Sequence, residues 1–305
     1  MRQKSSPAKV RKAIFPVGGL GTRFLPATKS MPKEMLPIVD KPLIHYAFEE
    51  ARAAGIEQFI FVTGRNKHAI EDHFDHMYEL QTHLSAQNKA RELHEISDWL
   101  PEAGNISFTR QQAPRGLGHA VWCARHLIGD EPFAVLLADD MVLAPQGCLS
   151  QMMEAYQSSG GNMLGVMDIP REQTASYGIV DIDPEAPPGD PRLIKARGLV
   201  EKPAPQEAPS TLSIIGRYIL QPGIFDMLDR QEPGAGGEIQ LTDALAKLIK
   251  TDAVYGYRFD GVRYDCGALV GFVAANVAYA LDREEIKTAM SHELRAVLAR
   301  AGVAL

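Results

Sequence analysis

Residues 13 to 17, Ala-Ile-Phe-Pro-Val, lead directly into Gly18-Gly19-Leu20-Gly21-Thr22-Arg23. This pattern predicts a buried strand and then a tight loop, because glycine lets the backbone turn sharply and approach a ligand closely. Clustered N–H groups with no side chains in front of them suit a phosphate group, and Arg23 and the later Lys33 add positive charge. We therefore expect a loop that wraps a nucleoside triphosphate. An ordinary glycine-rich turn with two surface cations is the alternative at this point.

Two common phosphate-binding motifs do not fit this stretch. A dinucleotide fingerprint, G-x-G-x-x-G/A, that began at Gly19 would require a small residue where the chain has Phe24. A Walker loop that began at Gly18 would require glycine in place of Arg23, and the sequence Gly-Lys-Ser/Thr occurs nowhere in the chain. The sequence therefore argues against a nicotinamide-dependent oxidoreductase.

The composition is that of a folded globular protein. The 305 residues are 45% hydrophobic and 23% charged, enough for one large domain or two modest ones. The net charge of −6 argues against nucleic acid as a partner. No run resembles a signal peptide or a membrane span, and a basic segment over residues 1–11 is expected to be flexible. Three widely spaced cysteines predict a reduced, cytoplasmic protein without structural zinc.

Strand and helix patterns alternate along the first half of the chain. Strands are predicted at residues 12–17, 58–63, 105–109 and 133–138, with helices at 42–54 and 119–127. The polar helical pattern at 66–96, with Asn66 as a cap, predicts an insertion or a helical pair on the surface. This alternation predicts an α/β fold with a mixed, mostly parallel sheet flanked by helices. Ligands bind at the carboxyl ends of such strands. The glycine-rich loop, Gln111 and the pair Asp139-Asp140 should therefore share one rim of the sheet.

The second half is more typical of antiparallel structure. Apolar or alternating runs at residues 162–169, 178–182, 193–200 and 213–220 are separated by Pro, Gly and Asp, which predicts a smaller antiparallel, sugar-facing section of the same sheet. A helix at 240–250 and a strand at 254–259 follow. We expect a single catalytic domain over 12–267 and a helical segment over 268–305 with enough apolar residues for an oligomer contact.

Five positions carry side chains or backbone suited to chemistry. Asp139 ends an apolar strand and could hold a divalent cation or simply face solvent. Asp265 follows another strand and could do the same or cap the next helix. Lys202 suits a phosphate and Glu201 suits sugar hydroxyls, although these two residues taken alone favour a charge pair on an edge strand. Gly178 opens a strand where bare backbone could approach a sugar.

Taken together, and in their order along the chain, these motifs resemble the signature of the sugar-phosphate nucleotidylyltransferases. The matching segments are residues 18–23, 25–44, 110–111, 116–120, 175–178, 200–203, 216–218, 234–243 and 265–267. The chain departs from the family in two places. The family often has alanine at Gly18 or Gly19, and it often has an apolar residue where this chain has Asp140, which leaves open which of Asp139 and Asp140 would face a metal.

The resemblance implies a Rossmann-like nucleotide-diphospho-sugar transferase fold and a magnesium-dependent reaction. UTP and glucose 1-phosphate would give UDP-glucose and pyrophosphate, by direct in-line attack of the sugar phosphate on the α-phosphate. Thymidylyl-transferring relatives usually have Lys-Gln-Leu-Leu-Pro where this chain has Lys33-Glu-Met-Leu-Pro37, which favours UTP over dTTP. Thymidylyl transfer, another sugar 1-phosphate, or a non-catalytic sugar-nucleotide-binding regulator are the alternatives. A homodimer or homotetramer is also implied.

The resemblance also assigns roles to individual positions. Arg23 would hold the β- and γ-phosphates, Lys33 would stabilise the reacting phosphates, and Lys202 would bind the phosphate of glucose 1-phosphate. The magnesium ligands would be Asp139 and Asp265. The remaining nucleotide contacts would come from Gly18, Gly19, Gly21, Thr22, Glu34, Gln111 and Gly116, and the glucose contacts from Gly178 and Glu201.

Overall fold

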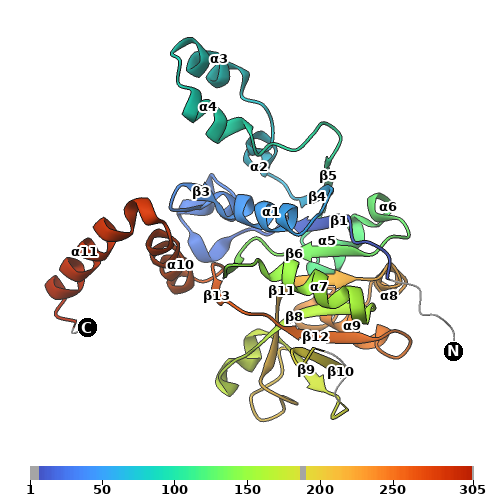
Figure 1. Ribbon diagram of the computed structural model, residues 1–305. Helices are drawn as coiled ribbons and strands as arrows, with labels where there is room; N and C mark the ends of the chain where they lie inside the picture. Colours follow the sequence, from blue (N-terminus) through green and yellow to red (C-terminus); the bar gives the residue numbers. More distant parts are fainter. Residues whose placement is uncertain (1–6, 186–189, 304–305) are drawn as a thin grey trace.

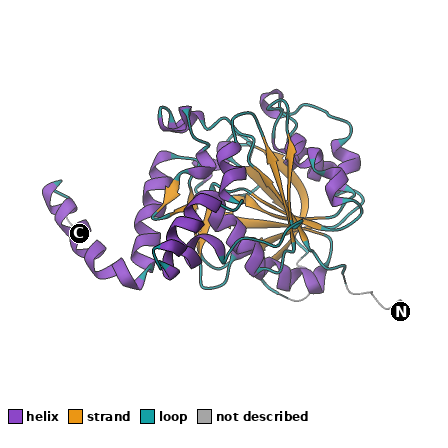
Figure 2. Cartoon of the chain, turned by 90° about the horizontal axis from the view of Figure 1, so that it is seen from above, coloured by secondary structure: helices purple, strands orange, loops and turns teal. Residues whose placement is uncertain are grey.

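A nine-stranded twisted sheet forms the centre of the molecule, and helices cover both of its faces (Figures 1 and 2). This computed structural model describes residues 7–185 and 190–303. Residues 1–6 of the predicted basic segment and residues 304–305 of the predicted C-terminal segment lie outside the described residues. The strand order is β5-β4-β1-β6-β11-β8-β12-β10-β9.

The strands lie close to their predicted positions. The nine strands of the main sheet are β1 (Lys12–Pro16), β4 (Gln58–Thr63), β5 (Ile106–Arg110), β6 (Phe133–Leu136), β8 (Asn162–Asp168), β9 (Gly178–Ile182), β10 (Leu193–Glu201), β11 (Leu212–Leu220) and β12 (Val254–Arg258). Two small antiparallel pairs, which the sequence patterns did not predict, join β2 (Pro37–Ile38) to β3 (Lys41–Pro42) and β7 (Asp140–Leu143) to β13 (Val262–Asp265).

The prediction of a mostly parallel sheet is wrong for the sheet as a whole. The junctions β5–β4, β4–β1, β1–β6 and β8–β12 are parallel. The other four, β6–β11, β11–β8, β12–β10 and β10–β9, are antiparallel. Three of the parallel junctions join β1, β4, β5 and β6, the strands from the first half of the chain, where strand and helix patterns alternate clearly in the sequence. The second half of the chain enters the same sheet, as expected, through long antiparallel strands.

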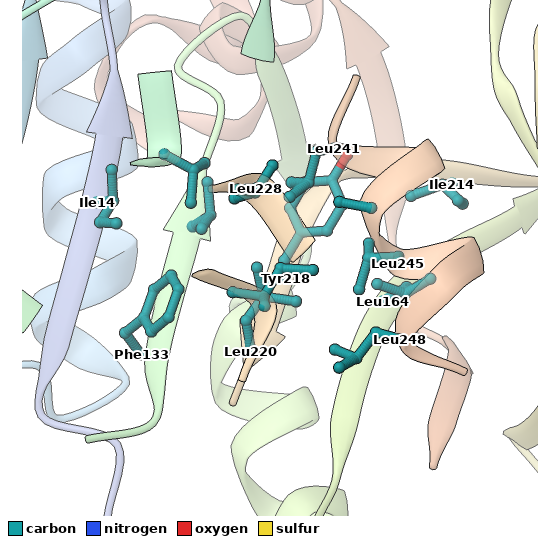
Figure 3. Close-up of a cluster of buried hydrophobic side chains, with 14 of the residues drawn as sticks. Ile14, Phe133, Leu164, Ile214, Tyr218, Leu220, Leu228, Leu241, Leu245 and Leu248 are labelled. Atoms are coloured by element: carbon teal, nitrogen blue, oxygen red, sulfur yellow. The ribbon is translucent and has the colours of Figure 1, made fainter. Parts of the chain in front are cut away.

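Helices on the two faces bury two separate apolar clusters. On one face α5 (Leu117–Cys123), α8 (Ile224–Leu228) and α9 (Leu241–Leu248) pack on the sheet through the cluster drawn in Figure 3, which includes Phe133, Tyr218 and Leu245. On the other face α1 (Leu43–Ala53) and α7 (Cys148–Ser159) cover a second cluster. Burial of both faces explains why the strands β1, β6 and β11 are apolar along most of their length.

The remaining helices lie at the periphery. The polar segment 66–96 forms α2 (His68–His73), α3 (Tyr78–Ala86) and α4 (Ala90–Ser97), which project from the sheet as predicted (Figure 1). Asn66 does not cap α2, since Lys67 is its N-cap. The helix predicted at 119–127 is broken at Ala124 into α5 and α6 (Arg125–Ile128). At the end of the chain α10 (Leu269–Asp282) packs against the body through Phe272, Ala275 and Tyr279, and α11 (Glu284–Arg300) extends away from it (Figure 1). No helix within the described residues is long and apolar enough to cross a membrane.

Candidate active site

The glycine-rich loop after β1 lines a cavity of about 410 Å³ at the carboxyl ends of the parallel strands. The other walls come from loops that follow β5 and β6. Of the residues predicted to contact the nucleotide or the metal, those on this cavity are Gly18, Gly19, Gly21, Thr22, Lys33, Glu34, Gln111, Gly116 and Asp139. The expectation that the glycine-rich loop, Gln111 and Asp139 share one rim of the sheet is therefore confirmed.

Glycine is required by the loop geometry at position 21, and position 18 leaves little room for a side chain. Gly21 has a φ of 68°, and a Cβ there would lie 3.1 Å from Cβ of Lys33. A Cβ at Gly18 would lie 3.1 Å from Oε1 of Gln111. A side chain at Gly18 would therefore stand between the loop and the amide of Gln111. These positions keep peptide groups open toward the cavity, as a phosphate-binding loop requires.

The amide of Gln111 is held in one orientation. Its Nε2 donates to the carbonyl oxygen of Gly116 at 3.0 Å and lies 3.0 Å from Nδ1 of His119. Both amide hydrogens are then used, so Oε1 is the atom free to accept a hydrogen bond from a ligand. Gly116 has a φ of 103°, and a Cβ there would collide with the backbone of Ile239. His119 was not predicted as a functional residue, although it lies in the matching segment 116–120.

Lys33 and Asp139 form an ion pair inside the cavity. Nζ of Lys33 lies 2.5 Å from Oδ2 of Asp139. Burial alone would lower the pKa of Lys33, but the carboxylates of Asp139 and Glu34 outweigh it and raise that pKa. Burial likewise works to raise the pKa of Asp139, and Lys33 outweighs it and lowers that pKa. Both side chains are therefore charged at neutral pH.

Asp139 and Asp265 converge on one point. A Cβ at Gly267 would lie 3.0 Å from Oδ2 of Asp139 and 3.0 Å from Oδ1 of Asp265. Only glycine leaves this gap between the two carboxylates. No cluster of three or more His, Cys, Asp or Glu side chains suited to a metal exists among the described residues. Two carboxylates with room beside them fit magnesium, which commonly takes one or two protein carboxylates and completes its shell with water and substrate phosphates.

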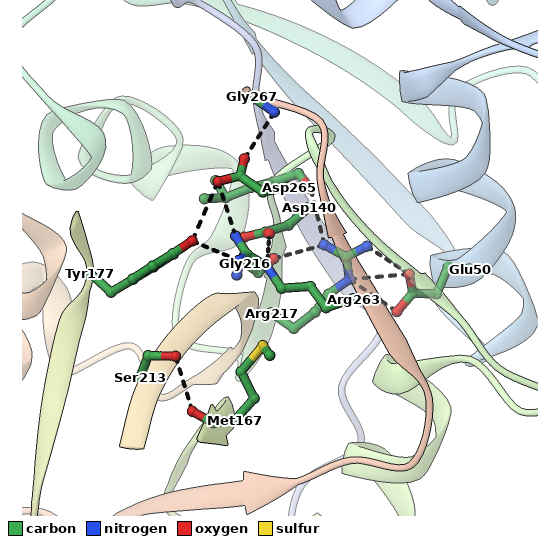
Figure 4. A network of polar contacts seen from close by, with 11 residues as sticks. Glu50, Asp140, Met167, Tyr177, Ser213, Gly216, Arg217, Arg263, Asp265 and Gly267 are labelled. Atoms are coloured by element: carbon green, nitrogen blue, oxygen red, sulfur yellow. Dashed lines mark hydrogen bonds and ion pairs between the residues drawn. The ribbon is translucent and has the colours of Figure 1, made fainter. Parts of the chain in front are cut away.

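Asp140 is engaged elsewhere, in the network of Figure 4. Its Oδ2 accepts a hydrogen bond of 2.7 Å from the backbone N–H of Gly216, and its Oδ1 accepts from Nε of Arg263. Burial raises the pKa of Asp140 against the opposing effect of Arg263. In the same network Arg217 forms a buried ion pair with Glu50 at 2.8 Å. These contacts orient Asp140 away from the cavity and leave Asp139 as the carboxylate that lines it.

The predicted sugar-side residues lie together at the start of β9 and the end of β10. Gly178 pairs with Glu201 across the two strands, and a Cβ at Gly178 would lie 3.2 Å from Oε2 of Glu201. Lys202 follows with a φ of 48°, and its Nζ lies 3.3 Å from Oε1 of Glu201. Tyr177 links this group to the carboxylate pair, because its hydroxyl donates to Oδ2 of Asp265 at 3.4 Å.

Arg23 and Glu34 occupy less expected surroundings. Arg23 is exposed, and its guanidinium donates to the carbonyl oxygen of Gly267 at 3.4 Å, so it stands beside the carboxylate pair. The carboxylate of Glu34 is almost fully buried and pairs with Nζ of Lys67 at 2.7 Å. Burial raises the pKa of Glu34 even though Lys67 opposes the shift. Lys67 was not predicted as a site residue, although its place just after β4, at the same rim, was a usable signal.

The comparisons with known proteins agree with this geometry. A family model described as nucleotidyl transferase matches residues 12–281. The UTP–glucose-1-phosphate uridylyltransferase of Bacillus subtilis (strain 168) is 51% identical over 279 residues, which cover 92% of this chain and 94% of that protein. A relative of the same name from Komagataeibacter xylinus is 49% identical over 261 residues, which cover 86% and 90% of the two chains.

Two solved structures share the α/β nucleotide-sugar transferase fold. A UTP-bound UGPase from Acinetobacter baumannii has a TM-score of 0.85 and 42% identity, covering 94% of this chain and 99% of that chain. A UDP-glucose pyrophosphorylase complexed with UDP-glucose has a TM-score of 0.81 and 42% identity, covering 90% and 100%. The match over residues 12–281 and about half of all positions shared with curated relatives show that this chain belongs to the nucleotidyl transferase family.

Proposed function

We propose that this chain is a magnesium-dependent uridylyltransferase that converts UTP and glucose 1-phosphate into UDP-glucose and pyrophosphate. One observation carries the proposal. The glycine-rich loop, the oriented amide of Gln111 and the Lys33–Asp139 pair line one cavity, and Tyr177 joins the Asp265 carboxylate to the sugar-side residues. The names of the relatives, and the UTP and UDP-glucose complexes among similar structures, support the same reaction.

The proposed base contact follows from the hydrogen bonds of Gln111. Because Nε2 is occupied by Gly116 and His119, Oε1 is left to accept the N3–H of uracil. Cytosine has no hydrogen on N3 and would place a second acceptor there. Thymine also carries an N3–H, so this contact alone does not separate UTP from dTTP; that preference rests on the similarity to uridylyl-transferring relatives.

The reaction needs alignment and charge neutralisation more than proton transfer. The phosphate of glucose 1-phosphate already carries an ionised oxygen, so no general base is required for in-line attack on the α-phosphorus. Two polyanions must nevertheless meet. In our proposal Arg23 holds the leaving β- and γ-phosphates, Lys33 steadies the reacting phosphates, and Lys202 holds the sugar phosphate. Gly178 and Glu201 would bind the glucose hydroxyls.

Asp139 and Asp265 would hold magnesium. When bound, the ion would neutralise charge on the α-phosphate and on the attacking oxygen. Oδ2 of Asp139 accepts a hydrogen bond from Nζ of Lys33 in this structure. A cation bound at Oδ2 would replace that ammonium group, and Lys33 would then turn toward the phosphate oxygens. Tyr177 and Gly267 hold Asp265, at 3.4 Å and 3.0 Å, and keep its carboxylate directed at the gap beside Gly267.

We also propose that residues 12–267 act as one catalytic unit in the cytoplasm and that the C-terminal helices form a homodimer or homotetramer contact. Support for the contact comes from exposed apolar side chains on α10 and α11, including Val270 at 82% exposure. Support for a reducing compartment comes from the three free cysteines.

A pyrophosphate-release assay across UTP, dTTP, ATP and GTP with several sugar 1-phosphates tests the reaction. We expect turnover to be highest with UTP and glucose 1-phosphate and to require magnesium. Turnover highest with dTTP would make the chain a thymidylyltransferase. UDP-glucose binding without any pyrophosphate release would mean that the chain only binds sugar nucleotides.

A further inference from the structure

A second cavity, of about 340 Å³, lies on the other side of the loop that carries Gln111. Its walls include three arginines, a histidine and a tryptophan: Arg110, Arg115, Arg125, His119 and Trp122. No carboxylate is among the described residues that line it. We refer to it as the basic cavity.

The arginines of the basic cavity lack acidic partners. None of Arg110, Arg115 and Arg125 forms an ion pair within 4.0 Å with a carboxylate among the described residues. The guanidinium of Arg125 instead lies 3.5 Å from the centre of the Trp122 ring and donates to the carbonyl oxygen of Trp122 at 3.1 Å. In a chain with a net charge of −6, three arginines without acidic partners around one cavity form a local field that attracts anions.

Guanidinium groups define the chemistry that would fit. Their planar donors match the oxygens of a phosphate group in pairs, and an ammonium could not reproduce that match. Trp122 holds Arg125 in place through a cation–π contact, so less side-chain freedom is lost when a ligand binds. The cavity, of about 340 Å³, is large enough for one or two phosphate groups.

The loop divides its residues between the two cavities. Gln111, Pro114 and Gly116 line the proposed nucleotide cavity, whereas Arg110, Gln112, Ala113 and Arg115 line the basic cavity. His119 lines the basic cavity and also touches Gln111, with 3.0 Å between its Nδ1 and Nε2 of Gln111. A ligand in the basic cavity therefore lies one side chain away from the atom proposed to read uracil.

We propose that the basic cavity binds a small, multiply charged anion of the phosphate class and that its occupancy weakens uracil binding through His119 and Gln111. The second half of this statement rests on the proposed function, since it uses the proposed role of Gln111. The charged or titratable groups that face His119 from the cavity walls are Arg110, Arg115, Arg125 and Cys123.

The coupling follows from hydrogen-bond polarity. Burial, with Arg115 adding to it, lowers the pKa of His119, which keeps the ring neutral and lets Nδ1 accept from Gln111. An anion among the arginines acts in the opposite direction and favours a proton on the ring. An N–H at Nδ1 would then face the amide hydrogens of Gln111. The amide would rotate and present its NH₂ to the nucleotide cavity, where the N3–H of uracil needs an acceptor.

Direct binding is tested by calorimetric titration of inorganic phosphate into the full chain with saturating UDP-glucose and without magnesium, at constant ionic strength set with chloride. We expect one phosphate per chain, and at least about tenfold weaker binding in the R115Q/R125Q double variant. R295Q, which removes the same kind of charge from the exposed face of α11, should bind phosphate like the wild type. Absence of binding, or equal binding in the double variant, would overturn the site.

Two further ligands define the source and the class of anion. Glycerol 2-phosphate that binds at least as tightly as inorganic phosphate would identify a phosphorylated metabolite as the occupant, and weaker binding would identify free phosphate. Either result supports a phosphate-class site. Citrate that binds while both phosphates fail would overturn the proposed ligand class.

The coupling is measured with uridine, which has no phosphate and so does not compete for the glycine-rich loop. We expect phosphate to weaken uridine binding at least about threefold at pH 6.5, and uridine to weaken phosphate binding by the same factor. The R115Q/R125Q variant should lose both effects, and unchanged uridine affinity in the wild type would overturn the coupling. Failure of the proposed function would look different: UTP and glucose 1-phosphate would release no pyrophosphate, while titration without UDP-glucose would still show phosphate bound in the basic cavity.

Discussion

Nζ of Lys33 lies 2.5 Å from Oδ2 of Asp139, although 106 residues separate the two in sequence. The same oxygen lies 3.0 Å from the point that a Cβ at Gly267 would occupy, and Asp265 is equally close to that point. One carboxylate oxygen thus faces both the lysine of the nucleotide cavity and the gap suited to a cation. Lys33, Asp139 and Asp265 form the centre of the proposed site, and the first predictions concern them.

Replacing Asp139 with asparagine should abolish most turnover while leaving the fold intact. The amide keeps the shape of the side chain but loses the charge that would hold a cation and pair with Lys33. We expect at least about a 100-fold loss of kcat at saturating magnesium, comparable with the loss of one preorganised charged contact. Circular dichroism should match the wild type. Turnover that recovers fully at high magnesium would show that Asp139 is not the main ligand.

The neighbouring substitution Asp140→Ala should act on stability instead. Asp140 is buried, accepts from the N–H of Gly216 and pairs with Arg263. Its removal leaves a buried guanidinium without its partner, which costs about 3 to 5 kcal/mol of unfolding free energy. Urea unfolding checks this value. A change below about 1 kcal/mol would mean that the Asp140 network in Figure 4 contributes little to stability.

Lys202→Asn should separate sugar-phosphate binding from nucleotide binding. Asparagine tolerates a positive φ such as the 48° of Lys202, so the backbone of the turn is preserved while the charge is lost. We expect KM for glucose 1-phosphate to rise and kcat to fall, together about 100-fold in kcat/KM, with UTP affinity within twofold of the wild type. Lys195→Asn, on the strand β10 that precedes Lys202 and paired with Asp183, is the matched control. Normal turnover in Lys202→Asn would remove Lys202 from the mechanism.

The buried pair of Glu34 and Lys67 predicts a rescue experiment. Lys67→Met leaves the Glu34 carboxylate buried without its partner, and we expect a loss of about 3 to 5 kcal/mol of stability. Adding Glu34→Gln removes the unpaired charge and should recover at least half of that loss. Urea unfolding of both variants measures the recovery. If the double variant is no more stable than Lys67→Met, the cost comes from lost packing and not from the unpaired carboxylate.

His73 should make the fold sensitive to mild acid. Burial, with the nearby His45, lowers the pKa of His73 from 6.5 to about 4. Between these two pH values the unfolded chain binds more protons than the folded chain, so stability falls as the pH drops through that window. His73→Gln should reduce the difference in unfolding free energy between pH 7 and pH 5. His76→Gln, at an exposed position, should leave it unchanged. If the difference in unfolding free energy between pH 7 and pH 5 is the same in His73→Gln as in the wild type, His73 is not the source of the acid sensitivity.

Much of the architecture was open to prediction because it follows local rules. The strands β4 and β9 begin and end where their apolar runs do, and the glycine-rich loop after β1 follows from three glycines in four positions. The polar segment 66–96 was correctly expected as peripheral helices. The direction of the strands was harder to predict, and half of the neighbouring strands in the sheet order are antiparallel. Direction depends on which distant strands become neighbours in the sheet, and no local sequence pattern specifies that.

The sequence by itself determined which chemical groups the site could contain: a bare-backbone loop, Arg23, Lys33 and carboxylates at strand ends. The tertiary structure alone decided which of two adjacent carboxylates, Asp139 or Asp140, faces the cavity. Arg263 pairs with Asp140 from 123 residues away, and Lys67 pairs with Glu34 from 33 residues away. The direction of a side chain in a loop depends on the partners that long-range packing brings to it, and the energy of a buried charge makes those partners decisive.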